Sequence, residues 1–347
     1  MKMLMKFSTT IILMLCFIFG FSMFAPDMVQ AKSKTVRFVA AVIPEGGPEV
    51  AAEPMALNMY LGALDYRFRT FHELKGKYTL KWVHTLFADS DECLTGVASG
   101  AAELTFSGPH YMEALEPAWK LGESPGVFDS WEHFMRTMNT PAWKALHEKM
   151  AKEKGITVIK WIANIGDFYL YTSKGPIKTI ADLKGQKIRF PGGEGFAKAL
   201  KTMGTTPISL PYTEVVTALQ TNMIDGLLTD MFAANYFYEL PRFTKYAVST
   251  AWAIQPISIV ANTKWWESMP PKERQAMQDV FDRIDVSLFF GNAQAGITQM
   301  WAGNPKTELL KLSSTEAQKF KKAMRAGSAD VISSVDPKLI EAIEASR

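Results

Sequence analysis

The chain has 347 residues, 48% of them hydrophobic, and its 38 basic and 35 acidic residues leave a formal charge of +3. Basic and acidic residues are interspersed, so the composition indicates neither nucleic acid nor an anionic membrane surface as a partner. A chain of this length and apolar content can bury two hydrophobic cores, and we therefore expect two domains.

The N-terminal segment has the pattern of a secretory signal peptide. Lys2 and Lys6 precede an apolar run over residues 11–24, and the small residue Ala31 follows it. We expect cleavage after Ala31 and a mature chain in the periplasm that begins at Lys32. An uncleaved membrane anchor is the alternative, but the apolar run is short for a membrane span.

The two cysteines do not predict a disulfide. Cys16 lies inside the apolar run without a small residue before it, so we do not interpret it as a lipid-attachment site. Cys93 is the only cysteine of the expected mature chain, and a single thiol cannot form an internal disulfide. We expect Cys93 to be a small buried residue.

Strand-like and helix-like patterns alternate along the mature chain. Strands are expected at residues 35–42, 78–84, 103–107, 156–161, 168–172, 186–190 and 226–229. Helices are expected at residues 55–71, 91–99, 131–154 with a division near Thr140, 180–184, 194–203 and 213–221, the last with Thr213 as N-cap. This alternation predicts an α/β architecture with largely parallel sheets, in which ligands bind beyond the carboxyl ends of the strands.

Motifs that carry enzyme chemistry are missing from the sequence. It has no zinc-binding His-Glu-x-x-His, nucleophile elbow, phosphate loop or Cys-x-x-Cys, and Gly193-Glu194-Gly195 lacks the third glycine of a dinucleotide fingerprint. Of the five histidines, His110 is worth a closer look, but no nucleophile or carboxylate partner can be placed near it. We interpret it as a locally hydrogen-bonded loop residue, and we expect no enzyme activity, metal or cofactor.

Arg189 is the residue that the pattern singles out. It lies near the carboxyl end of a short apolar strand, where a partly buried guanidinium needs a fixed partner. Two interpretations stay open: a protein carboxylate such as Glu194 or Glu214 pairs with Arg189, or the carboxylate of a ligand does. Aromatic and thioether side chains are frequent around this strand, and Phe168 and Tyr212 adjoin strand ends where a pocket could form; Trp252 belongs to the same set.

Three stretches of the sequence resemble a known family. They are residues 176–191 (PIKTIADLKGQKIRFP), 211–221 (PYTEVVTALQT) and 224–226 (IDG), with a weaker likeness at 265–271 (WWESMPP). Through them the mature chain resembles the solute-binding subunit of a tripartite ATP-independent periplasmic (TRAP) transporter, of the dicarboxylate-binding type.

The resemblance implies a periplasmic-binding-protein-like fold of two α/β domains, with a hinge, a ligand cleft between the domains and a long helix that spans both. The expected division is a signal peptide at 1–31, one domain from 32–166 plus 255–295, and a second from 167–254 plus 296–347. The crossings near Gly166 and Gln255 are carried over from the family.

The resemblance also implies a ligand site. In the family the arginine at the position of Arg189 grips the ligand carboxylate, Tyr212 walls the pocket, and Thr229 lies beside the ligand opposite Arg189. Further pocket positions implied in this way are Glu45, Asp89, Ser107, Gly108 and Tyr111.

Departures from the family pattern bear on the ligand. Many relatives have a second arginine where this chain has Phe168, asparagine where it has Gly192, and polar residues where it has Leu227 and Leu228. The site is therefore expected to be less polar. We expect a monoacid, a carboxylate or a sulfonate, with an apolar or aromatic body rather than a sugar acid or a small dicarboxylate.

The expected partners are this organic acid and the membrane permease subunits of a TRAP transporter, with the protein acting as a monomer or a homodimer. A sensor that reports the ligand to a membrane receptor is an alternative that the sequence leaves open. An enzyme on the same scaffold is a further one, disfavoured by the missing motifs.

Overall fold

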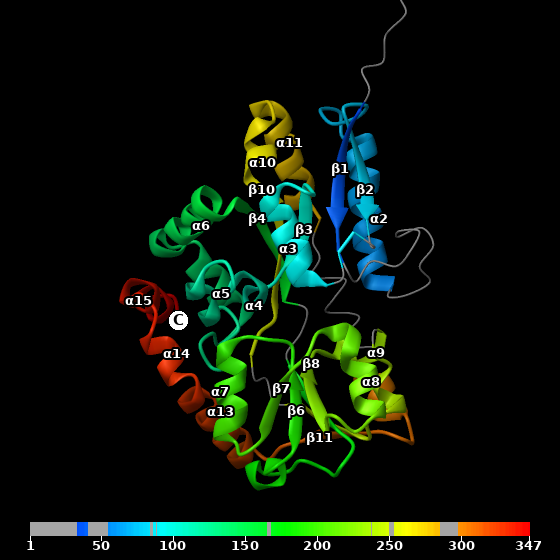
Figure 1. The fold of residues 1–347 in the computed structure, drawn as a ribbon, viewed down its shortest axis with the longest axis vertical. Helices are drawn as coiled ribbons and strands as arrows, with labels where there is room; N and C mark the ends of the chain where they lie inside the picture. The colour runs from blue at the N-terminus through cyan, green and yellow to red at the C-terminus, as the bar shows by residue number, and fades with distance from the viewer. Residues whose placement is uncertain are drawn as a thin grey trace, which may run out of the picture.

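The computed structural model describes residues 33–40, 55–83, 86–87, 89–164, 168–236, 238–249, 253–284 and 298–347. The signal peptide, Glu45 and Trp252 lie outside these residues, so the predictions about them stay predictions. Within these ranges no helix combines the length and the apolar character that crossing a bilayer requires. The described chain forms two β-sheets, one above the other in Figure 1, each flanked by helices.

The first domain is built on a five-stranded sheet. In spatial order its strands are β2 (Tyr78–Val83), β1 (Lys34–Val39), β3 (Leu104–Ser107), β10 (Pro256–Asn262) and β4 (Ile156–Asn164). β1 is parallel to β2 and β3, whereas β10 is antiparallel to β3 and β4.

The second domain is built on a six-stranded sheet. In spatial order its strands are β11 (Glu308–Lys311), β9 (Tyr246–Ser249), β5 (Tyr169–Thr172), β8 (Gly226–Thr229), β6 (Lys187–Phe190) and β7 (Thr206–Ser209). β5 is antiparallel to β8 and β9, and the other neighbours are parallel.

The expectation of largely parallel sheets holds for every strand but one in each sheet, and the reversed strands, β10 and β5, make both sheets mixed. The reversed strands, β5 and β10, are the first strands that the chain forms after passing from β4 into the second sheet and from β9 back into the first. When the chain enters a sheet at the carboxyl ends of the neighbouring strands, the strand that it forms must run opposite to them. The other strands of both sheets therefore end at the edge that faces the other domain, as the arrow of β1 shows in Figure 1.

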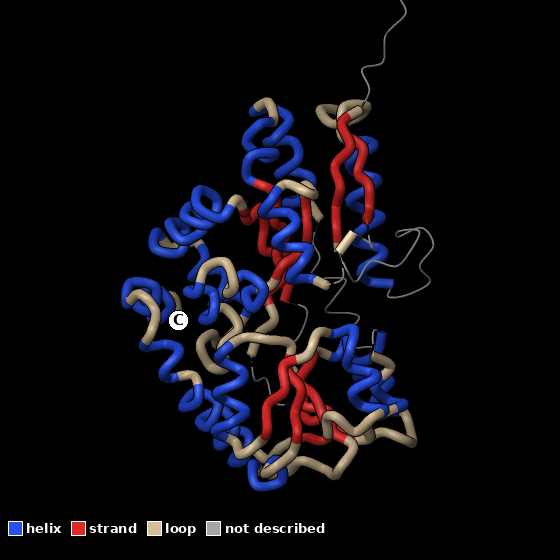
Figure 2. The backbone as a smooth tube through the Cα atoms, viewed as in Figure 1, coloured by secondary structure: helices blue, strands red, loops and turns tan. Residues whose placement is uncertain are grey.

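Helices and short 3₁₀ turns surround the sheets, as the blue segments of Figure 2 show. Those that follow strands of the first sheet are α2 (Met55–Thr70), α3 (Ser90–Ser99), α4 (Pro109–Met112), η1 (Pro117–Leu121), α5 (Trp131–Met138), α6 (Pro141–Lys154), α10 (Thr263–Ser268) and α11 (Pro271–Asp282). Those that follow strands of the second sheet are η2 (Ile180–Leu183), α7 (Glu194–Thr202), η3 (Tyr212–Glu214), α8 (Val215–Gln220), α9 (Met231–Tyr236), η4 (Leu240–Arg242) and α13 (Ser314–Gly327).

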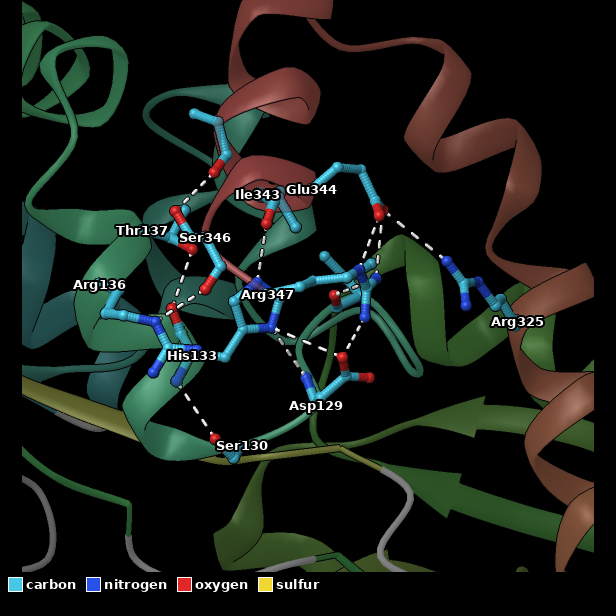
Figure 3. Close-up of polar contacts among 12 residues, drawn as sticks. Asp129, Ser130, His133, Arg136, Thr137, Arg325, Ile343, Glu344, Ser346 and Arg347 are labelled. Carbon is cyan, nitrogen blue, oxygen red and sulfur yellow. Dashed lines mark hydrogen bonds and ion pairs between the residues drawn. The ribbon is translucent and has the colours of Figure 1, made fainter.

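The C-terminal part of the chain runs along both domains. α13 packs against α7 of the second domain, and after α14 (Ala329–Ser333) the chain reaches α15 (Pro337–Ala345), which packs against α5 and α6 of the first. Figure 3 shows the contacts that hold this end of the chain. Arg347 forms ion pairs with Asp129 and Glu344, and Nε2 of His133 lies 2.8 Å from the carbonyl oxygen of Ile343.

Thr213 is not an N-cap, since it lies inside η3 and α8 begins at Val215; the backbone N–H of Glu214 donates to the carbonyl of Pro211, which closes a tighter turn first. A long helix that spans both domains is not found among the described residues. Residues 285–297 lie outside them, so that helix stays a prediction.

A cluster of aromatic side chains fills the core between α6 and β4. Trp119 lies 5.4 Å from both Trp143 and Trp161 in ring-centroid distance, and His147 lies 5.3 Å from Trp119. The same hydrophobic cluster contains Cys93, whose burial is confirmed. Burial lowers the pKa of His147 to about 4, so this ring is neutral at pH 7.

This burial predicts an acid-sensitive step in stability. The unfolded chain binds a proton at His147 near pH 6.5 and the folded chain only near pH 4, so the free energy of unfolding falls as the pH falls through this window. Between pH 7 and pH 5 the loss is up to about 2 kcal/mol for a shift of this size. His147→Gln should remove that slope in urea titrations, whereas His72→Gln, at an exposed histidine, should keep it. An unchanged slope in His147→Gln would contradict the assignment.

Candidate ligand-binding site

Arg189 lies on β6, in the interior of the second sheet, and its side chain is almost fully buried with a residue exposure of 2%. Its Nε and Nη2 donate to the carbonyl oxygen of Leu210 at 2.9 and 2.8 Å, and Nη1 donates to that of Leu228 at 3.5 Å. These carbonyl groups fix the plane of the guanidinium. Carbonyl groups carry no net charge, so they do not neutralise the positive charge of Arg189.

The sequence left open whether a protein carboxylate pairs with Arg189. Glu194 instead forms ion pairs with Lys198 at 2.7 Å and Lys120 at 3.5 Å, and Glu214 is exposed on η3. Among the described residues, no ion pair joins Arg189 to an aspartate or glutamate. The geometry therefore favours an anion from outside the chain.

Tyr238 is a site residue that the sequence analysis missed. Its hydroxyl is hydrogen-bonded by Arg189 and Thr229, and its ring centre lies 6.0 Å from the Arg189 guanidinium carbon. Burial raises the pKa of Tyr238, and the positive charge of Arg189 opposes that rise. Tyr238 belongs to no motif and follows a short helix, so nothing in the sequence pattern distinguishes it from a core tyrosine.

Two predicted tyrosines lie near this group from different sides. Tyr111, on α4 of the first domain, has its pKa raised by burial and lies within electrostatic range of Arg189 and Tyr238. Burial raises the pKa of Tyr212 on η3 to about 12, with Cys93, Tyr238 and Asp89 adding to the rise. The structure thus places Tyr111, Tyr212 and Tyr238 around one region between the two sheets.

The remaining polar positions lie at strand and helix ends. Ser107 ends β3 and Thr229 ends β8, and both are buried at the edges where the two sheets face each other. Gly108 follows directly after Ser107. The Asp89 carboxylate accepts from the backbone N–H of Glu92 at 2.9 Å, so it caps α3 as well as lying near Tyr212.

Phe168 and Gly192 have surroundings of a different kind. Phe168 has no exposed surface, and its ring packs 4.7 Å from that of Phe196 in the hydrophobic core of the second domain. Its role as a pocket wall stays a prediction. Gly192 has a φ of +143°, a conformation that favours glycine.

The interpretation of His110 as a residue without a carboxylate partner is wrong. Its Nδ1 lies 2.7 Å from Oε2 of Glu123, with side-chain exposures of only 4% and 3%. Its ring also contacts that of Tyr111, with a centroid distance of 3.7 Å and the two planes tilted by 46°. Glu123 lies in the loop after η1, 13 residues from His110, and no helical or strand spacing could have indicated this pairing.

The domains meet beside this pair, at the start of α7. The backbone N–H of Glu194 lies 3.4 Å from Oε2 of Glu113, and the Glu194 carboxylate lies 3.5 Å from Nζ of Lys120. Burial raises the pKa of Glu113, and the hydrogen bond from Glu194 opposes that rise. These polar contacts connect the α4–η1 segment of the first domain to the second domain.

Comparison with known proteins gives a consistent result. The family model of the bacterial extracellular solute-binding proteins, family 7, matches residues 60–333. The 2,3-diketo-L-gulonate-binding periplasmic protein YiaO of Escherichia coli is 28% identical over 272 residues, which cover 76% of this chain and 74% of that protein.

Solved structures agree in fold. A TRAP periplasmic solute-binding protein from Shewanella oneidensis with bound succinate has a TM-score of 0.77 at 21% identity and covers 90% of this chain and 99% of its own. One from Bordetella, with density interpreted as pantoate, has a TM-score of 0.75 at 18% identity and covers 91% of this chain and 100% of its own. The predicted two-domain α/β fold and the resemblance to this class are confirmed.

Proposed function

Because the chain belongs to the bacterial extracellular solute-binding protein family 7, we propose that it captures a monoacid with an apolar or aromatic body and delivers it to TRAP permease subunits. Membership makes it a binding component of transport and not an enzyme, and it is a periplasmic protein that binds organic acids. The proposal itself concerns two points, namely that the organic acid is a monoacid with an apolar or aromatic body and that it is delivered to a permease.

The observation that carries the proposal is the buried guanidinium of Arg189. Backbone carbonyls hold its guanidinium in place, and none of the ion pairs among the described residues involves it. A carboxylate or sulfonate of the ligand would supply that charge through paired hydrogen bonds, which is the geometry that arginine favours. One arginine in this position supports a ligand with one anionic group.

The body of the ligand is inferred from the side chains around Arg189. Tyr111, Tyr212 and Tyr238 offer aromatic faces together with neutral hydroxyl groups, and Phe168 stands where many relatives have a second arginine. Such surroundings favour an apolar or aromatic body over a second charged group. The ligands of the compared proteins include succinate, with two carboxylates, and pantoate, with one carboxylate on a branched body.

Hinge closure is the proposed mechanism. The acid docks on Arg189 in an open form, and contacts from both domains, including Tyr111 from the first, stabilise the closed form. The proposed domain boundaries near Gly166 and Gln255 are supported by the passages from β4 to β5 and from β9 to β10. The permease subunits need only prefer the closed, loaded surface for delivery to follow.

Arg189→Ala is expected to weaken acid binding by at least about thirtyfold, because a truncated hydrogen-bonded charge pair costs roughly 2–5 kcal/mol. Titration calorimetry measures the affinity, and far-UV circular dichroism checks the fold. The matched control is Arg37→Ala, a strand arginine of the first domain whose partner is Glu103, and it should bind like the wild type. If Arg189→Ala binds within a few-fold of the wild type, Arg189 is structural.

A thermal-shift screen of the purified protein against organic acids should single out aromatic or branched monoacids. A ligand at a hundred times its dissociation constant adds about 2.7 kcal/mol to stability, which is readily seen as a rise in melting temperature. Succinate and sialic-acid-like sugar acids serve as comparison compounds. Tight binding of those, without binding of any aromatic or branched monocarboxylate, would overturn the ligand class. Mass spectrometry of the denatured protein identifies any acid that has co-purified.

A further inference from the structure

The His110 ring is clamped between three predicted pocket residues. It contacts the tilted ring of Tyr111 at a centroid distance of 3.7 Å. A Cβ added to Gly108 would lie 3.3 Å from both its Cε1 and its Nδ1, and a Cβ added to Gly192 would lie 3.8 Å from its Cδ2. The His110 ring therefore lies between Gly108 of the first domain and Gly192 of the second, and Cε1 and Cδ2 are the two ring atoms bonded to Nε2.

Nε2 of His110 is buried and has no hydrogen-bond partner in the described part of the chain. Buried polar atoms are rarely left in this condition, because the hydrogen bonds to water that they lose must be replaced. A group of the bound ligand would supply the missing partner, since the ring lies between Gly108 and Gly192, two predicted pocket residues without side chains.

Glu123 fixes which nitrogen of the ring carries the proton. An ionised carboxylate only accepts hydrogen bonds, so Nδ1, at 2.7 Å from Oε2 of Glu123, carries the proton in the neutral ring. Nε2 then has a lone pair and accepts. Asp91 and Glu113 also lie within electrostatic range of His110, which disfavours a second anionic group of the ligand at this place.

We propose that Nε2 of His110 accepts a hydrogen bond from a hydroxyl group of the acid held by Arg189, so that the natural ligand is a hydroxylated monoacid. Glu123 is a positioning residue, which acts through the tautomer and orientation of the His110 ring. This inference rests on the proposed function, because it assigns a second contact in the same cleft.

The experiment compares the affinities of isovalerate, 2-hydroxyisovalerate and 3-hydroxyisovalerate by titration calorimetry, with phenylacetate and mandelate as the aromatic series. In the series that binds, the wild type should prefer a hydroxylated acid by about threefold to tenfold, the range of one net hydrogen bond. His110→Phe keeps a ring against Tyr111 but has no acceptor, and its preference should fall to about one. Glu123→Gln, whose amide can donate to Nδ1 and so reverse the tautomer, should reduce the preference as well.

His72→Phe, at an exposed histidine after α2, is the matched control and should keep the wild-type preference. The role of His110 is overturned if the wild type binds plain and hydroxylated acids equally, or if His110→Phe keeps the preference. Neither outcome counts against the proposed function. Tighter binding of valine, whose ammonium group can also donate to Nε2, would overturn the assignment of a hydroxylated ligand. Failure of every acid in both series, or binding that survives in Arg189→Ala, counts instead against the proposed function.

Discussion

The site depends on how the chain accommodates one buried positive charge. Placing a guanidinium inside a sheet is costly, and the structure offsets part of that cost with the carbonyl groups of Leu210 and Leu228. Carbonyl dipoles orient the fork without neutralising it. The result is a buried cation of fixed orientation, with the hydroxyl groups of Tyr238 and Thr229 close by.

The three tyrosines give the proposed ligand site its chemical character. Burial raises the pKa of Tyr111, Tyr212 and Tyr238, so all three stay protonated near neutral pH and can both donate and accept hydrogen bonds. A region with one fixed charge and several neutral hydroxyls discriminates by shape and hydrogen bonding more than by net charge. His110, held by Glu123, adds an acceptor of defined direction to the same region.

The sequence was sufficient to predict what depends on local pattern. Most strands and helices, the buried Arg189 and the two-domain α/β class follow from periodicity and from the stretches around residues 176–191 and 211–221. The reversal of β5 and β10 was not predictable in this way, because strand direction depends on which edge of a sheet the chain enters.

The side chains that sequence reasoning missed share a physical reason. Tyr238 and Glu123 reach their partners through tertiary packing, across loops that have no fixed spacing. Thr213 has the right residue type for an N-cap, but the 3₁₀ turn that follows Pro211 displaced the start of the helix. In each case a local rule was overridden by the geometry of a longer segment.

The position of β10 in the first sheet has a consequence for folding during export. β10 pairs with β3 on one side and β4 on the other, although the chain reaches it only after the strands β5 to β9 of the other sheet. Before residues 256–262 emerge, β3 has no partner on one side and β4 has no strand to pair with, so the first sheet is incomplete. Such non-local pairing slows folding. If the chain crosses a membrane from its N-terminus, the first domain cannot finish folding until most of the chain has crossed. This order favours transport in an unfolded state.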